Sequence, residues 1–246
     1  MSPTEDLIHV MKRLRLSGLL LTLAMRIQQA LDDDLDHQEF LHRLLNDEVQ
    51  RRDAKQAELR MRRASFEMSK SFEDFDFTFN PRIPKAKVVD LATCAFVGRS
   101  ENVLLVGKTG VGKSHIAQAI GQRACLAGHT VLYTSADEAF TKLRAARADD
   151  TYERVLAKYT APDLLIVDDI GLRPLRHDEP VDLYELIRRR YEKGATIFTS
   201  NRAIEEWPPL FKDELLASAA MDRLLHHAHV LVLDGESFRG ARRKAA

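Results

Sequence analysis

Cysteine is scarce in this chain: Cys94 and Cys125 are the two among 246 residues. Two cysteines cannot build the disulfide framework of a small secreted domain, and their spacing matches no common metal-binding pattern. We therefore expect both side chains to be reduced thiols, as in a cytoplasmic protein.

Long apolar runs are also missing. The longest run, from Leu19 to Met25, is interrupted by Thr22 and is much shorter than the roughly 20 residues that a membrane helix needs. The first residues do not have the pattern of a signal peptide. The sequence therefore predicts a cytoplasmic protein with no membrane partner.

The chain lacks an excess of charge of either sign, because lysine plus arginine and aspartate plus glutamate number 37 each. A balanced chain is not attracted to nucleic acid as a whole, so any DNA site must be a local basic patch. An apolar fraction of 45% is enough for a sizeable core. The length fits one domain of moderate size, or one domain with an appendage.

One glycine-containing stretch fits the complete phosphate-loop pattern G-x-x-x-x-G-K-[ST]. Residues 102–106 before it form a short apolar run, and residues 115–120 after it have helical spacing. This strand–loop–helix context favours a nucleotide site over a chance match in a loop. The stretch comprises Gly107, Lys108, Thr109, Gly110, Val111, Gly112, Lys113 and Ser114.

The residue types of this stretch suit ATP with Mg²⁺. Gly110 and Gly112 let the backbone approach a phosphate closely, and the following helix directs free N–H groups and its positive dipole end at the anion. Lys113 would bridge the β- and γ-phosphates, and the Ser114 hydroxyl would ligate Mg²⁺. We therefore expect ATP and Mg²⁺ as cofactors.

From residue 102 onward, predicted strands and helices alternate. This alternation is typical of an α/β fold with a mostly parallel sheet and helices on both faces. We expect no helical domain beyond the sheet, because the sequence ends soon after its last strand. Strands are expected at residues 102–106, 130–134, 164–168, 195–199 and 229–233, and helices at about 113–127, 136–147, 151–159, 179–192 and 213–226.

Residues 1–70 have helical periodicity instead and predict a small N-terminal helical domain. Asp36 and Glu39 form a capping-box pattern at the start of its third helix. Arg51 and Arg52 begin an arginine-rich face farther along that helix. This face is either solvated surface or a contact with DNA phosphates.

Residues 71–101 predict a linker and a lead-in helix before an ATPase domain at residues 102–246. Phenylalanines alternate with acidic residues at the start of the linker, and we expect them to pin it onto the core. Pro81 and Pro84 stop any helix. A single helix is expected at residues 88–97.

Two acids end the strand expected at residues 164–168. A Mg²⁺–nucleotide site needs a carboxylate at the tip of a strand beside the phosphate loop, so Asp168 is the candidate for holding the metal, directly or through water. Asp169 is placed to orient an attacking water as a general base. Asn201, at the tip of the next strand, could position that water or touch the γ-phosphate. A turn asparagine is the alternative.

Two arginines near the end of the sequence are further candidates. Arg223 either pairs with its neighbour Asp222 or reaches the nucleotide site of an adjacent subunit. There, an arginine stabilises the charge on the transferring phosphoryl group. Arg239 is either a nucleotide-sensing residue or the start of a basic tail.

Together these residues resemble the IstB-like transposition helpers, which are AAA+ ATPases of bacterial insertion sequences. The resemblance covers nearly the whole chain, and its last two segments are specific to that family. Helicase loaders of the DnaC and DnaI type are the nearest relatives of the family and share its Met-Asp-Arg pattern. The matching segments are residues 40–52, 72–76, 101–105, 186–191, 206–207, 221–227 and 235–239.

The resemblance implies a AAA+ fold and a role for each candidate. The implied roles are Walker A for Lys113 and Ser114, Walker B for Asp168 and Asp169, first sensor for Asn201, arginine finger for Arg223 and second sensor for Arg239. Many family members have Asp-Glu where this chain has two aspartates. The shorter second side chain implies slow hydrolysis, with ATP binding intact.

The function implied by the resemblance is an ATPase that assembles as a homo-oligomer on duplex DNA and delivers or activates a cognate transposase. One alternative is a helicase loader that acts on single-stranded DNA. Another is a phosphate-loop kinase of small molecules, although no arginine-rich lid segment for a kinase is visible. Basic residues expected near the strand ends could track the DNA backbone without reading its sequence: Lys142, Arg144, Arg173 and Arg176.

Overall fold

The structure, a computed structural model, describes residues 3–67 and 70–238. Its contacts divide the chain into two compact units, Met1–Leu59 and Arg60–Ala246. Residues 60–67 thus belong with the second unit. The three domains expected from the sequence, with boundaries after residues 70 and 101, stay a prediction. Among the described residues, no helix has both the length and the apolar character needed to cross a membrane.

The first unit is helical, as the sequence predicts. A small apolar core holds its helices together, formed by Met11, Leu19, Leu23 and Leu44. Asp36 Oδ1 accepts hydrogen bonds from the N–H groups of Gln38 and Glu39, at 2.8 and 2.9 Å, so the aspartate caps the third helix. The helices are α1 (Pro3–Arg13), α2 (Ser17–Asp32) and α3 (His37–Arg63), the last of which continues into the second unit.

A parallel sheet forms the centre of the second unit. Within the described residues it has five strands in the order β2-β3-β4-β1-β5, which confirms the predicted sheet. Its inner strands β1, β3 and β4 are almost wholly buried because both faces are covered. The strands are β1 (Val103–Val106), β2 (Val131–Ser135), β3 (Leu164–Ile170), β4 (Ala195–Ser200) and β5 (His229–Val232).

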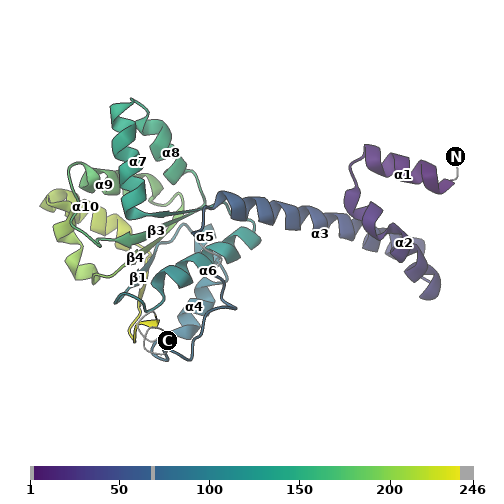
Figure 1. The fold of residues 1–246 in the computed structure, drawn as a ribbon, viewed down its shortest axis with the longest axis horizontal. Coiled ribbons are helices and arrows are strands. Elements are labelled where there is room, and N and C mark those ends of the chain that lie inside the picture. The colour runs from purple at the N-terminus through teal and green to yellow at the C-terminus, as the bar shows by residue number, and fades with distance from the viewer. Residues whose placement is uncertain (1–2, 68–69, 239–246) are drawn as a thin grey trace, which may run out of the picture. The chain divides into compact units, whose positions relative to one another are not determined.

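Helices cover both faces of this sheet (Figure 1). Strand residues alternate between two cores: Ile166 packs into the core on one face, whereas Leu165 and Val167 pack into the core on the other. The first face carries α4 (Lys85–Leu91), α5 (Ala95–Gly98) and α6 (Lys113–Leu126). The second face carries α7 (Ala136–Ala148), α8 (Tyr152–Thr160), α9 (Glu179–Arg190) and α10 (Glu214–Leu225).

The prediction of one helix over residues 88–97 is wrong, because α4 and α5 are separate. Cys94 lies between them in the left-handed region, with φ 60°, which interrupts the helical hydrogen bonding. The break lets Leu91 and Phe96 enter the same core. Beyond β5, the described residues form no helical domain.

Candidate functional site

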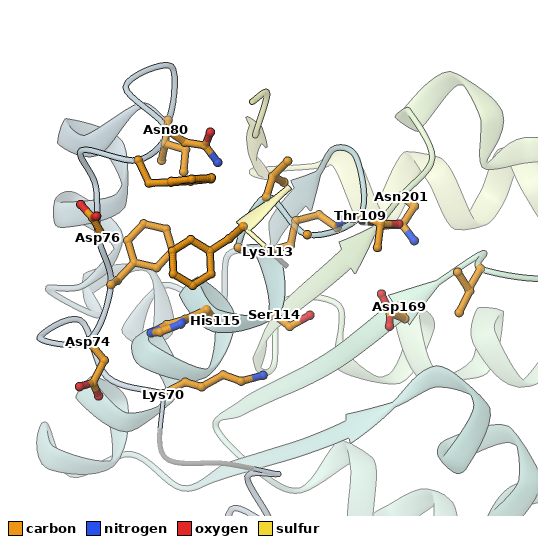
Figure 2. Close-up of a pocket in the computed structure, with 18 residues that line it drawn as sticks. Lys70, Asp74, Asp76, Asn80, Thr109, Lys113, Ser114, His115, Asp169 and Asn201 are labelled. Carbon is orange, nitrogen blue, oxygen red and sulfur yellow. Dashed lines mark hydrogen bonds between the residues drawn. The ribbon is translucent and has the colours of Figure 1, made fainter. Parts of the chain in front are cut away.

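A cavity of about 330 Å³ lies where the phosphate loop meets the carboxyl ends of β3 and β4. Open α/β sheets bind ligands at this edge. Figure 2 shows side chains from distant parts of the sequence converging on it. Its lining includes residues 109–115, Asp169, Asn201, a wall from residues 70–83, and Phe238.

The phosphate loop is shaped to hold an anion. Gly112 precedes α6 with φ 103°, and no side chain caps the helix there, so the first N–H groups of α6 are available to a phosphate. A Cβ atom on Gly112 would lie 2.7 Å from Phe75 Cε2. Glycine is therefore required at this position by both the backbone angle and the space.

Lys113 and Asn201, two of the predicted site residues, come together at the cavity. The Lys113 side chain is 5% exposed, and its Nζ donates to the carbonyl oxygens of Gly107 and Lys108 at 2.7 and 2.8 Å and to Asn201 Oδ1 at 2.5 Å. These acceptors are neutral, so a phosphate oxygen would be a stronger partner for the ammonium. The contact places Asn201 in the cavity beside the Lys113 ammonium, and its role toward the nucleotide stays a prediction.

An irregularity in β3 directs Asp169 into the cavity. The register between β3 and β4 shifts between Val167 and Ile170, and Asp169 has φ 58°. Its N–H donates to Thr199 Oγ1 at 2.9 Å. Bulges of this kind re-aim a side chain next to a site. In Figure 2 the Ser114 hydroxyl points toward the side of the cavity where Asp169 lies.

Asp168 is buried behind the lining residues. Its side chain lies on the α6 face of the sheet, because it alternates with Ile166. One carboxylate oxygen, Oδ2, accepts a hydrogen bond from the Tyr133 hydroxyl at 2.7 Å, and the other accepts one from the Thr199 hydroxyl. Burial, and then the nearby Asp168 carboxylate, raise the pKa of Tyr133 well above its ordinary value.

One wall of the cavity is aromatic, which sequence reasoning missed. The Phe79 and Phe238 rings meet edge to face with centroids 5.0 Å apart. Asn80 joins the two segments, since its Oδ1 accepts from the Glu236 N–H at 3.0 Å and its Nδ2 donates to the Glu236 carbonyl at 3.1 Å. The Phe238 N–H donates to the Gly110 carbonyl at 3.0 Å. The linker phenylalanines Phe72, Phe75 and Phe77 do pack on the core as predicted, and Phe75 among them also lines the cavity. The Asn80–Glu236 contact that completes this wall spans 156 residues, so no local pattern could have shown it.

Comparison with known proteins decides the family. The model of the IstB-like ATP binding protein family matches residues 9–246. The chain belongs to this family. It is 39% identical to an ATP-binding protein of insertion sequence IS21 from Pseudomonas aeruginosa, over 96% of this chain and 89% of that protein. An insertion-sequence ATP-binding protein from Mycobacterium tuberculosis is also 39% identical, with 96% and 94% covered.

Solved structures confirm the AAA+ fold of this IstB-like chain. The DnaI structure matches with a TM-score of 0.57 and 23% identity, covering 68% of this chain and 92% of that chain. The replication initiator DnaA bound to AMPPCP and single-stranded DNA matches with a TM-score of 0.57 and 20% identity, covering 70% of this chain. The chain spans about half of that DnaA chain, 52%. At these identities the likeness concerns the fold.

The IstB-like chain keeps Arg223 away from its own cavity. Arg223 lies on α10 and is not among the lining residues. Its Nη1 donates to the Ala219 carbonyl at 2.8 Å, and its guanidinium carbon lies 5.8 Å from the centre of the Tyr184 ring. Within the described part of the chain, it forms no ion pair with Asp222. Arg239 lies outside the described residues.

In the first unit, Arg51 and Arg52 are engaged by a buried carboxylate. Both donate to Glu48 Oε1, at 3.3 and 2.7 Å, and the Gly18 N–H donates to Glu48 Oε2 at 2.5 Å. Burial opposes the charge of Glu48, but the hydrogen bonds from Arg51, Arg52 and Gly18 hold its pKa at about 2. The two arginines therefore pair within α3, while Glu48 itself joins α3 to Gly18 of α2. Both arginines are less available to DNA than the sequence suggests.

The other DNA candidates divide into paired and unpaired residues. Arg173 donates to Asp137 at 2.6 Å and to the buried Glu179 at 2.7 Å, and Lys142 donates to Glu138 at 2.6 Å. Of these four candidates, Arg144 and Arg176 have side chains that form no hydrogen bond or ion pair with another described residue.

Proposed function

We propose that this chain is an ATPase that assembles on duplex DNA and recruits or activates a transposase. The observation that carries the proposal is the complete phosphate loop, preformed at the end of β1, in a chain of the IstB-like family. The relatives named above are ATP-binding proteins of insertion sequences. The transposase of the same element is the partner that such a protein would serve.

ATP would lie with its phosphates on the loop and its base toward the aromatic wall. Lys113 would exchange the Asn201 amide for a phosphate oxygen, because a charged acceptor binds its ammonium more strongly. Phe75, Phe79 and Phe238 offer rings of the kind that pack against a purine. Backbone N–H groups of α6 would hold the phosphates in place.

The oxygen-rich end of the cavity fits Mg²⁺. This ion binds to few protein oxygens and takes the rest of its ligands from phosphates and water. The Ser114 hydroxyl would be a direct ligand, and the buried Asp168 would hold the ion directly or through water. When bound, Mg²⁺ would neutralise charge on the β- and γ-phosphates. Asp169 would orient the attacking water from the cavity wall.

Assembly would complete this site. Arg223 lies outside the cavity of its own chain, so an adjacent subunit's cavity is the place where it would meet a γ-phosphate. Its planar guanidinium stays charged and can hold two oxygens. We propose a homo-oligomer on this ground, with Arg144 and Arg176 among the side chains that contact the DNA backbone.

Lys113→Ala tests the nucleotide part of the proposal and its link to DNA. We expect the loss of a charged hydrogen-bond donor to weaken ATP binding roughly 10- to 100-fold and to abolish ATP-dependent binding to duplex DNA. Calorimetric titration measures the first effect, and filter binding with and without ATP measures the second. Lys193→Ala, which removes an exposed lysine in the turn before β4, is the control and should behave as the parent.

Unchanged ATP affinity in Lys113→Ala would defeat the assignment of the phosphate loop. Duplex binding should weaken steeply with salt and vary little with sequence, because phosphate contacts release counterions. A clear preference for single-stranded DNA would favour the helicase-loader alternative.

A further inference from the structure

Tyr133 connects an edge strand of the sheet to the Walker B carboxylate. It lies on β2 and is 3% exposed. Its hydroxyl donates to Asp168 Oδ2 at 2.7 Å, while the Thr199 hydroxyl from β4 donates to Oδ1. Two donors from opposite neighbouring strands therefore hold the two oxygens of a buried carboxylate.

We propose that Tyr133 is a positioning residue for Asp168, acting through the metal-binding geometry of that carboxylate. The inference rests on the proposed function, because it takes Asp168 as part of the Mg²⁺ site. A carboxylate held at both oxygens cannot rotate about its terminal bond without breaking a hydrogen bond. The lone pair left on each oxygen therefore keeps one direction, and a preoriented ligand binds its ion with less loss of freedom.

The end of α3 supports Tyr133 in turn. The Tyr133 N–H donates to the Ala64 carbonyl at 2.8 Å, so the residues after α3 extend the open edge of β2. The Phe66 ring lies 6.3 Å from the Tyr133 ring, centroid to centroid, and a Cβ atom on Gly121 of α6 would come within 2.9 Å of Phe66. These contacts all lie within the second unit. A shift of residues 64–66 would consequently reach Asp168 through Tyr133.

Tyr133→Phe removes the hydroxyl and leaves the ring in place. A matched control exists in Tyr152→Phe, since the Tyr152 hydroxyl also donates to a buried carboxylate at 2.7 Å, that of Asp182 on α9. Binding of a fluorescent ATP analogue is measured in EDTA and across a Mg²⁺ titration. In EDTA, the parent and both variants should bind alike. The Mg²⁺ concentration that gives half of the full increase in affinity should rise about fivefold or more in Tyr133→Phe and stay unchanged in Tyr152→Phe.

The melting temperatures of the parent and of Tyr133→Phe are measured as well, to detect any general loss of stability in the variant. Equal Mg²⁺ midpoints in the parent and in Tyr133→Phe overturn the inference, whatever the change in melting temperature. A parent protein that binds no nucleotide defeats the proposed function instead, so the two failures are distinct.

A second variant tests the support from α3, and its measurement as a single variant does not depend on the folding of Tyr133→Phe. Phe66→Leu keeps the Tyr133 hydroxyl but loosens the packing of its ring. We expect a smaller rise in the Mg²⁺ midpoint, about twofold. Adding Phe66→Leu to Tyr133→Phe should cause no further rise, because the effects of two substitutions that act through one contact do not add. An unchanged midpoint in Phe66→Leu, or two fully additive shifts, excludes Phe66 from the connection.

Discussion

At the scale of single residues, Asp169 shows how a strand is modified to serve a site. A non-glycine residue in the left-handed region costs roughly 1 kcal/mol or more. Asp169 is held there, with φ 58°, by the hydrogen bond of its N–H to Thr199. The same conformation turns its side chain into the cavity while Asp168 remains buried. Adjacent acids thus acquire different surroundings and, by our proposal, different roles.

Asp169→Asn should separate ATP binding from hydrolysis. Asparagine tolerates the left-handed region, so the fold and the Lys113 contacts should persist, but a carboxamide cannot accept a proton from water. We expect ATP affinity within about twofold of the parent and hydrolysis lower by about 100-fold or more. Phosphate release and ATP titration are the measurements. Asp150→Asn, at an exposed aspartate that also has positive φ, is the control. Hydrolysis at the parent rate would show that Asp169 is not the base.

At the scale of elements, α2 and α3 of the first unit are joined by polar contacts as well as by a small core. Glu48 is 4% exposed and accepts the Gly18 N–H at the start of α2. A Cβ atom on Gly18 would lie 2.7 Å from Glu48 Oε2, so glycine permits this close approach. Arg51 and Arg52 complete the partners of the carboxylate. A buried charge is tolerable in a protein when it is paired in this way.

Glu48→Gln should destabilise the helices of the first unit, and the effect should depend on pH. The folded pKa of Glu48, about 2, is below its ordinary value of 4.5. Its charge therefore contributes stability that is fully present above pH 4.5 and is lost as the pH falls toward 2. At pH 7 we expect a loss of about 1–3 kcal/mol, which should shrink as the pH is lowered.

Thermal unfolding followed by circular dichroism, at pH values from 7 to 3, measures this effect. Asp53→Asn, at an exposed aspartate of the same helix, should change stability little at any pH. A constant difference between Glu48→Gln and the parent across the whole range would contradict the role of the Glu48 charge.

At the scale of the whole molecule, Arg223 lies outside the nucleotide cavity of its own chain. Arg223 rests on its own helix, with its guanidinium on the Ala219 carbonyl and near Tyr184. Within the described residues, no helical domain follows β5 to close over the cavity. By our proposal, Arg223 of another subunit supplies positive charge to the γ-phosphate.

Arg223→Ala should keep ATP binding by the isolated subunit but lose ATP-dependent assembly on DNA and hydrolysis. Mixing it with Lys113→Ala protein should restore some activity, because some interfaces then pair an intact Arg223 with an intact phosphate loop. Sedimentation with duplex DNA and phosphate release are the measurements, and Arg188→Ala, on the exposed side of α9, is the control. If the two variants co-assemble without recovering activity, Arg223 acts within its own subunit or supports the fold.

Much of this protein could be predicted from local sequence because the relevant interactions are local. The phosphate loop depends on glycines and a lysine at fixed spacing, and the strands on short apolar runs that are buried on both sides. The Asp36 cap needs partners two and three residues away. The parallel sheet follows from the alternation of these elements, and most of the residues proposed for the nucleotide site were accessible from sequence. The AAA+ fold was implied by the resemblance to a family, not by local patterns.

Tertiary structure alone decided the features that depend on distant partners. Whether Asp168 or Asp169 lines the cavity depends on a shift in the register between β3 and β4. The break at Cys94 depends on the burial of Leu91 and Phe96, from the helices on either side of it, in one core. The aromatic wall exists because Asn80 binds the backbone of Glu236, and Asp168 is oriented by Tyr133 and Thr199 from strands on either side. No local pattern records such contacts, because their free energy appears only when the folded chain brings the partners together.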